Sequence, residues 1–450
     1  MTRGQGAPPK GPRPIQSTRA QSTTFTNARN GQFTNMAGAN GEGPSGGIVP
    51  ALTFHIDPRD IAPLIGHGPK NIRRPELTPH WCIVKEIAEF SYDEDRNIHL
   101  DARSLAYYYP PPDDPDGPPF LYLDRGLESF RKTDDSVDEH LVGLLAAIMG
   151  MEKKQNAKID THFISYRGMM TNLLTMGFSR LDEWVMSATF FDGTVFIEED
   201  KSAKAAAKER QRSRDKGPDM SYFYGFKFET LFTIPDTWDN VTREEIENRD
   251  DKPVSNFAQY CSIVKTGVGN MGIVVGGEVD SVWDDKVEGR KNQNYVELKT
   301  RVCNNFSHQS DKDKENYERK QMKYWAQSYL IGCPKIIVGR RSRDGRLILP
   351  VEQLTTMNIP TDVRNSTHIW DSVLCVQTLN AFLEWLYNQL KDTSGVWQLA
   401  KRRNEMIVHL IRRTAEGTEQ ILTDEFKQHR CELARARLSE AVDKCPTYYE

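Results

Sequence analysis

The stretch YVELKTR, residues 295–301, alternates apolar and charged side chains in the manner of a half-buried β-strand. Side chains two residues apart leave a strand on the same face, so Glu297 and Lys299 point the same way. The simplest interpretation is a solvated sheet face that carries an ion pair. The alternative is that the two charges serve one reaction, and the segments upstream bear on that choice.

Two strand candidates upstream also carry acids among aromatic and branched apolar residues. The segment 221–234, SYFYGFKFETLFTI, is predicted as a strand that carries Glu229, and the segment 261–283 has Glu278 and Asp280 on one face. Burying an unpaired charge is costly, and four carboxylates brought together by adjacent strands repel each other unless a cation holds them. Mg²⁺ or Mn²⁺ suits such oxygen ligands. Zinc is not expected, because no histidine is interleaved with the acids.

A lysine beside such a metal site has a chemical use. Lys299 would orient and deprotonate an attacking water, or offset the charge that gathers on a phosphorane-like transition state. The order E…E-x-D…E-x-K resembles the catalytic core of the D-(D/E)xK nucleases, which hydrolyse phosphodiesters with one or two metal ions. E-x-K alone is a common triplet, but E-x-D followed within one hairpin by E-x-K is more specific. The predicted catalytic group is Glu278, Asp280, Glu297 and Lys299.

Composition limits the class of protein. The 450 residues are 38% hydrophobic with a formal net charge of −4, so contact with nucleic acid would depend on a local basic patch. No stretch reaches the roughly 20 apolar residues that a membrane span needs, and the N-terminus has no apolar signal region, so no membrane association is expected. The cysteines are odd in number and form no CxxC pair, which argues against a disulfide framework and a structural zinc. They lie at positions 82, 261, 303, 333, 375, 431 and 445.

The chain divides into a polar tail and one large domain. Residues 1–50 are rich in Gly, Pro, Ser, Thr, Gln and Asn and bury too little apolar surface to offset their ordering entropy, which predicts a disordered tail. Residues 51–445 are predicted to form a single catalytic α+β domain, with mixed or antiparallel sheets and flanking helices. The basic run 201–219 is an insert in it, a loop or exposed helix. A solvated excursion is the simplest interpretation, with a localisation signal or phosphate contact as alternatives.

Further elements follow from turn and helix signals. They are a strand at 80–93, a helix at 136–154 entered through Ser136, hairpins at 181–200 and 335–350 that turn at Asp192-Gly193 and Asp344-Gly345, helices at 317–332 and 371–392, and a segment after Gly395 whose period fits strand or helix.

Four motifs in order resemble one protein family. The similarity is to the DXO family of RNA 5′-end decapping enzymes, and its motifs are GFKFE (225–229), GEVD (277–280), YVELKT (295–300) and YWAQSYL (324–330). SYRGMMTNLL (165–174) resembles the arginine motif of that family, and the likeness runs from about residue 80 to 390. The long N-terminus and the insert favour the fungal branch, whose members also bind the nuclear 5′–3′ exoribonuclease.

The resemblance implies roles for individual residues. It implies that two metal ions are bound by Glu229, Glu278, Asp280, Glu297 and the backbone carbonyl of Leu298. Lys299 and Gln327 would lie at the scissile phosphate. Arg167 would hold RNA phosphates through its planar guanidinium. The other substrate contacts that the family implies are Arg96, Glu139, Cys261 and Glu278.

Three of these residues have a plainer interpretation as well. Gln327 would then be a cap residue on a surface helix, Cys261 a small core residue, and Arg167 a buried partner for one of the acids. The resemblance, rather than the spacing, favours their substrate-binding roles. For the four acids and Lys299, the residue pattern and the resemblance agree.

The favoured interpretation is a metal-dependent hydrolase of RNA 5′ ends. The resemblance implies removal of pyrophosphate from 5′-triphosphate RNA, of incomplete or unmethylated caps, and of NAD caps, each by attack of water on the α-phosphate to leave a 5′-monophosphate. It also implies partnership with a nuclear 5′–3′ exoribonuclease, which needs that product, and therefore a nuclear location. The alternatives are a non-catalytic stabilising subunit of the exoribonuclease, and a DNA endonuclease of the wider nuclease class. The net charge gives no evident basic surface for gripping duplex DNA.

Overall fold

The computed structural model describes residues 51–56, 80–111, 120–134, 137–212, 220–284, 294–303, 310–413 and 421–443. These residues belong to one compact unit. The tail predicted over 1–50 lies outside them. None of the helices in this part of the chain is long and apolar enough to cross a membrane.

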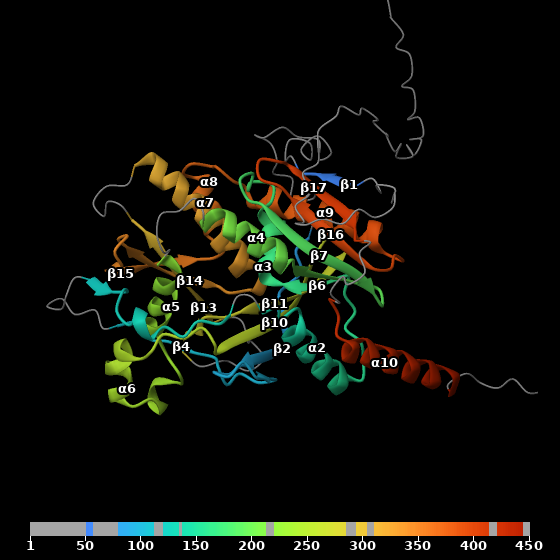
Figure 1. The fold of residues 1–450 in the computed structure, drawn as a ribbon, viewed down its shortest axis with the longest axis horizontal. Helices are drawn as coiled ribbons and strands as arrows, with labels where there is room; N and C mark the ends of the chain where they lie inside the picture. Colours follow the sequence, from blue (N-terminus) through green and yellow to red (C-terminus); the bar gives the residue numbers. More distant parts are fainter. Residues whose placement is uncertain are drawn as a thin grey trace, which may run out of the picture. The chain divides into compact units, whose positions relative to one another are not determined.

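Two β-sheets form the framework of the described residues (Figure 1). The larger has ten strands, in the order β1 (Leu52–His55), β17 (Ile407–Arg412), β16 (Val396–Lys401), β7 (Trp184–Phe191), β8 (Thr194–Glu199), β6 (Phe163–Tyr166), β11 (Met271–Glu278), β10 (Gln259–Val268), β2 (Lys85–Tyr92) and β3 (Ile98–His99). The smaller has seven, in the order β5 (Phe120–Tyr122), β15 (Arg346–Thr355), β14 (Lys335–Arg341), β13 (Tyr295–Val302), β12 (Ser281–Val282), β4 (Tyr107–Tyr108) and β9 (Thr233–Ile234). Both sheets mix parallel and antiparallel pairs: β6 is parallel to β8 and β11, and β13 is parallel to β14.

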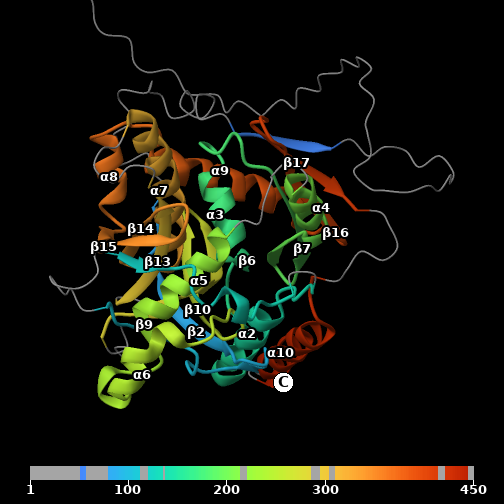
Figure 2. The same cartoon turned by 60° about the vertical axis from the view of Figure 1, so that its left-hand side comes forward.

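Helices pack on both faces of the sheets. Those of the described residues are α2 (Val142–Gln155), α3 (Arg167–Thr175), α4 (Lys201–Arg212), α5 (Ser221–Phe232), α6 (Arg243–Glu247), α7 (Asp311–Ile331), α8 (Ile359–Arg364), α9 (Ser372–Leu390) and α10 (Asp424–Asp443). Figures 1 and 2 show α3 beside both α7 and α9, and residues of these three helices pack against one another. The result is an α+β fold, as the sequence predicts.

Alternating strand residues divide the interior into separate cores. Ile273 of β11 and Ile336 of β14 join the largest core, which connects one face of each sheet through α3, α7 and α9. Val274, the next residue in β11, points the other way into a core that α2 and α10 complete. Ile337, the next residue in β14, enters a third core under α5. Burial on both faces explains why β11 is apolar or glycine at every position before Glu278, and why Ile336, Ile337 and Val338 follow one another in β14.

The turns that the sequence predicts are present. Asp192 and Gly193 both have positive φ, 48° and 78°, in the tight turn between β7 and β8. Gly345, with φ of 89°, turns the β14–β15 hairpin. Gly332, at φ of 72°, ends α7 in the left-handed conformation. The strand at 80–93 appears as β2, and the helix at 371–392 appears as α9.

The prediction for 221–234 is wrong, because most of this segment is the helix α5. Its buried residues recur at helical spacing: Phe223, Tyr224, Lys227, Phe228, Leu231 and Phe232. Aromatic residues on both sides of these positions hide that period, so the segment satisfies a strand pattern equally well. Glu229 is therefore supplied by a helix, and the acids do not all come from neighbouring strands.

Three smaller expectations also change or become definite. The helix predicted at 136–154 begins at Val142 rather than near Ser136, which lies outside the described residues. The basic insert forms α4 over its first part, and residues 213–219 lie outside the described range. The ambiguous segment after Gly395 is both kinds of structure in turn, with β16 and β17 followed by α10.

Candidate active site

Glu278 and Asp280 lie where the chain passes from one sheet to the other. β11 of the larger sheet ends at Glu278 and β12 of the smaller begins at Ser281, so the E-x-D spacing spans this link rather than a single strand. Val279 anchors the link, because it is buried and its N–H donates to the carbonyl of Tyr260 at 3.0 Å. Asp280 Oδ2 accepts a 2.6 Å hydrogen bond from the backbone N–H of Leu298 in β13. The link therefore holds Asp280 against the E-x-K strand.

Glu297 is the centre of the site. Its side chain is 1% exposed, and its two oxygens face different cations. Oε2 accepts a 2.7 Å hydrogen bond from Nη1 of Arg167, and Oε1 lies 2.5 Å from Nζ of Lys299. Burial alone would raise the pKa of Glu297, but Arg167 and Lys299 outweigh it and lower that pKa to about 2. The carboxylate is therefore charged at neutral pH.

Arg167 reaches Glu297 from the larger sheet. It is the first residue of α3, directly after β6, which is paired in parallel with β11. The chain of β11 passes close beneath it, because a Cβ on Gly277 would meet Arg167 Cβ and Cδ at 3.2 Å and Ile331 Cγ2 at 2.8 Å. Any side chain at 277 would displace the arginine or α7. Glycine in GGEVD therefore makes room for the cation that holds Glu297.

Lys299 lies between two carboxylates. Besides Glu297, Asp280 Oδ2 is 3.9 Å from its Nζ, and the lysine side chain is 24% exposed. Burial favours the neutral amine, but Glu297 and Asp280 raise the pKa of Lys299 above its ordinary value. A charged, partly accessible ammonium beside the acids is the arrangement that the opening motif predicts.

Glu229 joins the group from α5, which packs on β13. Burial and then the charges of Asp280 and Glu278 raise its pKa well above the ordinary value, although Lys299 opposes the shift. The acids that the sequence singles out are thus close enough to repel one another. Helix α5, rather than a third strand, makes this possible.

The carboxylates carry more negative charge than the site neutralises. Burial, followed by Glu297 and Glu278, raises the pKa of Asp280 to about 7. Burial also raises the pKa of Glu278, with Glu297 adding to the effect and Arg167 opposing it. Burial and unneutralised neighbouring charge both favour the protonated form of an acid, so a cation among these carboxylates would lower their pKa values.

The donor set suits a hard divalent cation. Glu229, Glu278, Asp280 and Glu297 offer only oxygen, and an ion among them would remove the repulsion that raises three of their pKa values. In this conformation no three acidic, histidine or cysteine side chains of the described residues are arranged around one ion. Glu297 instead faces its two cations, and Asp280 faces the N–H of Leu298. The ligand assignment, including the Leu298 carbonyl, stays a prediction.

A second group of predicted residues adjoins the carboxylates. Cys261 of β10 is paired with Glu278 of β11, and its pKa is raised first by burial and then by Glu278. Arg96 lies nearby and binds Glu139 with 2.7 Å hydrogen bonds from Nη2 to both oxygens. The pKa of Cys261 also responds to Arg96, Glu139 and Arg167, so these four residues lie in one region.

Gln327 is on the helix that the prediction names, but no hydrogen bond or ion pair joins its side chain to another described residue. It lies on α7 between Tyr324, whose pKa responds to Lys299, and Ile331, which packs over Gly277. Residues three and four apart share a helix face, so Gln327 is on the face of α7 toward the site. Among the described residues it has no hydrogen bond to another member of the site, and its predicted role stays untested.

Gln259 is a site residue that the sequence analysis missed. Its Oε1 accepts a 2.6 Å hydrogen bond from Arg96 Nη1, and its side chain also hydrogen-bonds Glu278, which lowers the pKa of that acid. It therefore connects the Arg96 group to the carboxylates. The signal was its position two residues before Cys261, on the same face of β10.

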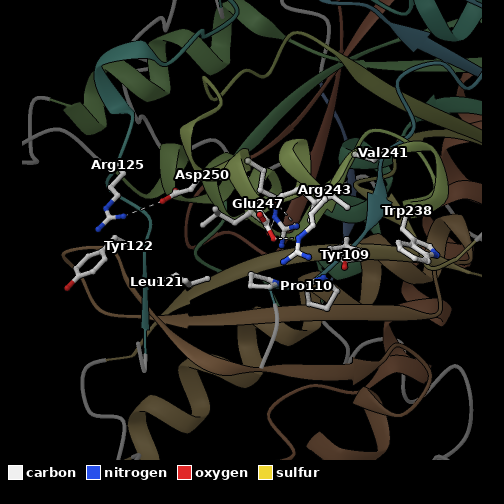
Figure 3. A pocket seen from close by; sticks show the side chains of 14 residues that line it. Tyr109, Pro110, Leu121, Tyr122, Arg125, Trp238, Val241, Arg243, Glu247 and Asp250 are labelled. Atoms are coloured by element: carbon white, nitrogen blue, oxygen red, sulfur yellow. Dashed lines mark hydrogen bonds and ion pairs between the residues drawn. The ribbon is translucent and has the colours of Figure 1, made fainter. Parts of the chain in front are cut away.

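A separate pocket of about 740 Å³ lies away from these residues (Figure 3). Its lining includes Trp238, Tyr109, Pro110 and Leu231, and its edge carries the Arg243–Glu247 ion pair, 2.6 Å from Nε to Oε1. Leu231 and Glu229 are two residues apart in α5 and so point to nearly opposite sides of that helix. None of the predicted site residues lines the pocket, which therefore has no part in carboxylate chemistry.

Comparison with known proteins agrees with this geometry. The sequence model of the RAI1-like PD-(D/E)XK nucleases matches residues 84–427. The chain belongs to that family. It is 42% identical to the decapping nuclease RAI1 of Neurospora crassa over 354 residues, 78% of this chain and 83% of the relative.

Solved structures of the same family share the fold. Rai1 of Candida albicans in complex with pU5-Mn2+ matches with a TM-score of 0.73 and 29% identity, over 79% of this chain and 96% of that one. Rai1 of Scheffersomyces stipitis in complex with (3'-NADP)+ and calcium ion matches with a TM-score of 0.71 and 28% identity, over 78% and 97% of the two chains. The predicted family and nuclease fold are confirmed, and the chain is an enzyme of the nuclease class.

Asp280→Asn tests the repulsion in this site. Asp280 has a folded-state pKa of about 7, above its ordinary 3.8, so the folded protein binds the extra proton and loses stability as pH rises between those values. In protein freed of metal with a chelator, Asp280→Asn should raise the free energy of unfolding at pH 8 by roughly 1 to 4 kcal/mol, since one pKa unit corresponds to about 1.4 kcal/mol. At pH 4 the difference should nearly vanish. Thermal melting across this range, with Asp101→Asn at an exposed ion pair as control, is the measurement.

Proposed function

We propose that the protein is a divalent-metal-dependent hydrolase that acts on RNA 5′ ends and leaves a 5′-monophosphate. The observation that carries the proposal is the buried Glu297 carboxylate, held between Arg167 and Lys299 beside three further acids. Its support from relatives is that RAI1 of Neurospora crassa is a decapping nuclease, and that Rai1 of Candida albicans was crystallised with pU5-Mn2+.

The proposed ligands for the metal are Glu229, Glu278, Asp280, Glu297 and the Leu298 carbonyl. When bound, Mg²⁺ or Mn²⁺ would polarise the phosphate oxygens and lower the pKa of a nearby water. Binding would require the oxygens of Glu297 and Asp280 to turn from their present partners toward the ion. Two ions are proposed from the family resemblance.

The chain's own residues supply charge and position. Lys299, held at the acids by Glu297 and Asp280, would offset the negative charge that develops on the attacked α-phosphate. Arg167 would hold a neighbouring phosphate with the donors that Glu297 leaves free. The end group of the RNA departs with the leaving side. One site can therefore act on a triphosphate, an unmethylated cap and an NAD cap.

The direct test offers the purified protein four RNAs of one sequence, with 5′-triphosphate, unmethylated-cap, methylated-cap and NAD ends. We expect 5′-monophosphate RNA from some or all of these ends, with the end group released intact, only when Mg²⁺ or Mn²⁺ is present. Asp280→Ala should abolish every one of these reactions together, because all depend on one set of ligands. Asp101→Ala is the matched control. Near-normal turnover by folded Asp280→Ala would make the carboxylate group structural and overturn the proposal.

Lys299→Ala tests the role of the ammonium. The variant should slow the chemical step by about 10²-fold or more, the scale of losing one preorganised charge-stabilising donor, while metal affinity changes little. Lys299→Arg should not restore the rate, because a planar guanidinium does not reproduce a compact ammonium. Single-turnover cleavage and Mn²⁺ calorimetry separate the two effects. If Lys299→Ala cleaves at the wild-type rate, the lysine is only the strand-face partner of Glu297.

We also propose a nuclear 5′–3′ exoribonuclease as partner, and hence a nuclear location. A 5′-monophosphate end is the substrate that such an exoribonuclease needs. The pocket in Figure 3 offers a surface for a protein partner, because Trp238 stands 65% exposed beside apolar residues. It lies on the far side of α5 from the acids, so binding and catalysis would be separable. A non-catalytic stabilising subunit is the alternative function.

Trp238→Ala should weaken capture of the exoribonuclease at least tenfold, the scale of losing an aromatic anchor, while cleavage of free RNA persists. Asp280→Ala should do the opposite and keep the complex while losing hydrolysis. Leu181→Ala, which removes another exposed apolar side chain, is the control. Binding of the purified exoribonuclease, followed by mass photometry or pull-down, gives the comparison. Loss of binding by folded Asp280→Ala would instead place the interface at the acids.

A further inference from the structure

A row of cations continues from the active site along the smaller sheet. Arg301 follows Lys299 at i+2 in β13 and so lies on the same face. Arg340 of β14 is its direct partner across the parallel pair of strands. Side chains of paired residues in neighbouring strands leave the sheet on the same side, about 4.8 Å apart. Helix α7 lies over this face, because Tyr317 stacks on Arg301 at 3.9 Å from its guanidinium carbon to the ring centre.

The row is poorly neutralised. Arg301 has one carboxylate near it, Glu352, at 3.6 Å from Nε to Oε2, and that acid also accepts a hydrogen bond from Tyr317. Within the part of the chain that the structure describes, Arg340 has no ion-pair partner. The Nε atoms of Arg301 and Arg340 are both buried without a hydrogen-bond acceptor. Like charges placed directly opposite on neighbouring strands destabilise a sheet unless an anion joins them.

Lys320 extends the row onto α7, because it follows by three residues Tyr317, whose ring stacks on Arg301. It is exposed and, among the described residues, also lacks an ion-pair partner. Partial burial of its amine, and then the charges of Arg341 and Arg301, lower the pKa of Lys320 below the ordinary value. The guanidinium groups of Arg341 and Arg301 therefore add to the positive potential around Lys320. Tyr324 lies one turn further along α7. Lys299 and Arg301 both lower its pKa, so the row and the catalytic lysine lie near the same tyrosine.

A purely structural role explains this arrangement poorly. The Arg301–Tyr317–Glu352 contacts do tie α7 to β13 and β15. They need one arginine, however, and they leave Arg340 and Lys320 as added repulsion. An anion bound between these cations explains better why Arg340 and Lys320 lie near Arg301. Residues i and i+2 of a strand are about 6.6 Å apart, a distance comparable to that between successive phosphates of an extended single strand.

We propose that Arg301, Arg340 and Lys320 bind the backbone phosphates of the RNA on the 3′ side of the scissile bond. This inference rests on the proposed function, since Lys299 must lie at the scissile phosphate for the row to lead away from it. Guanidinium groups suit phosphate oxygens because they donate two parallel hydrogen bonds, and Tyr324 offers an aromatic surface beside the path. The substrate would then be an RNA with several unpaired nucleotides at its 5′ end.

The experiment compares 5′-triphosphate substrates of two and of twenty nucleotides. For Arg340→Gln, Lys320→Gln and Arg301→Gln, we expect a raised KM for the long RNA. The ratio of kcat/KM for the long RNA to kcat/KM for the short RNA should then be about tenfold lower than in the wild-type protein. Arg402→Gln, an exposed arginine in an i,i+3 ion pair far along the chain, is the control. Arg301 packs on Tyr317, so melting curves accompany its variant, and exposed Lys320 keeps the test valid if Arg301→Gln does not fold.

Salt dependence gives a readout that a structural role would not move. Dissociation constants for the long RNA, measured in the Asp280→Ala background so that RNA is not consumed, should depend on log salt with a slope about 0.7 smaller for each cation removed. Variants that match Arg402→Gln in slope and length dependence would overturn the inference.

Two further outcomes are informative. If the variants weaken triphosphate substrates of both lengths but spare NAD-capped ones, the row binds phosphates of the leaving group and the inference is wrong. If wild-type protein cleaves neither length, the proposed function itself has failed. Wild-type cleavage of both lengths with unaffected variants would refute this inference alone.

Discussion

The carboxylate of Glu297 connects the two β-sheets at the active site, through its ion pair with Arg167. Arg167 comes from the helix that follows β6 of the larger sheet, whereas Glu297 and Lys299 belong to β13 of the smaller one. At the site the sheets are also joined covalently, through Val279 and Asp280, and Asp280 accepts a hydrogen bond from the Leu298 N–H of the smaller sheet. The same few residues therefore hold the two sheets together and place the acids close to one another. This double use is why Gly277 must remain without a side chain under Arg167.

This arrangement affects how variants should be interpreted. Removing one partner of a buried ion pair usually costs about 3 to 5 kcal/mol, because the other charge is left uncompensated. Loss of Glu297 would strand Arg167, whose side chain is only 12% exposed, so a Glu297 variant mixes unfolding with loss of function. Asp280 has no such dependent cation, since Lys299 is 3.9 Å from it and closer to Glu297. Asp280→Asn therefore strands no cation and keeps an oxygen acceptor for the Leu298 N–H, so its effect on catalysis can be measured in a folded protein.

The sequence predicts the part of the site that depends on strand alternation. Glu297 and Lys299 share a face because the strand period is two, and the glycine turns fix both hairpins. The sequence does not predict that Glu229 stands on a helix, because α5 is apolar and aromatic on nearly all sides and fits either period. Gln259 and the cations beyond Lys299 were missed for a different reason. Arg301 and Arg340 are 39 positions apart and become neighbours only through the parallel pairing of β13 with β14, which no local pattern encodes.

The charge of the site connects its acids with its cations. Four carboxylates face Arg167 and Lys299, which leaves two negative charges if every acid is ionised. Burial and the repulsion among the acids raise the pKa values of Asp280, Glu278 and Glu229. One divalent ion has the charge to balance the two remaining negative charges. A second would bring two positive charges in excess, and the phosphates of an RNA 5′ end are the groups that can offset them. In the arrangement proposed above, the row from Arg301 to Lys320 binds the phosphates that follow on the 3′ side of Lys299. Acids that need a cation and cations that need an anion thus lie side by side, and a phosphate placed at Lys299 with its metal satisfies both.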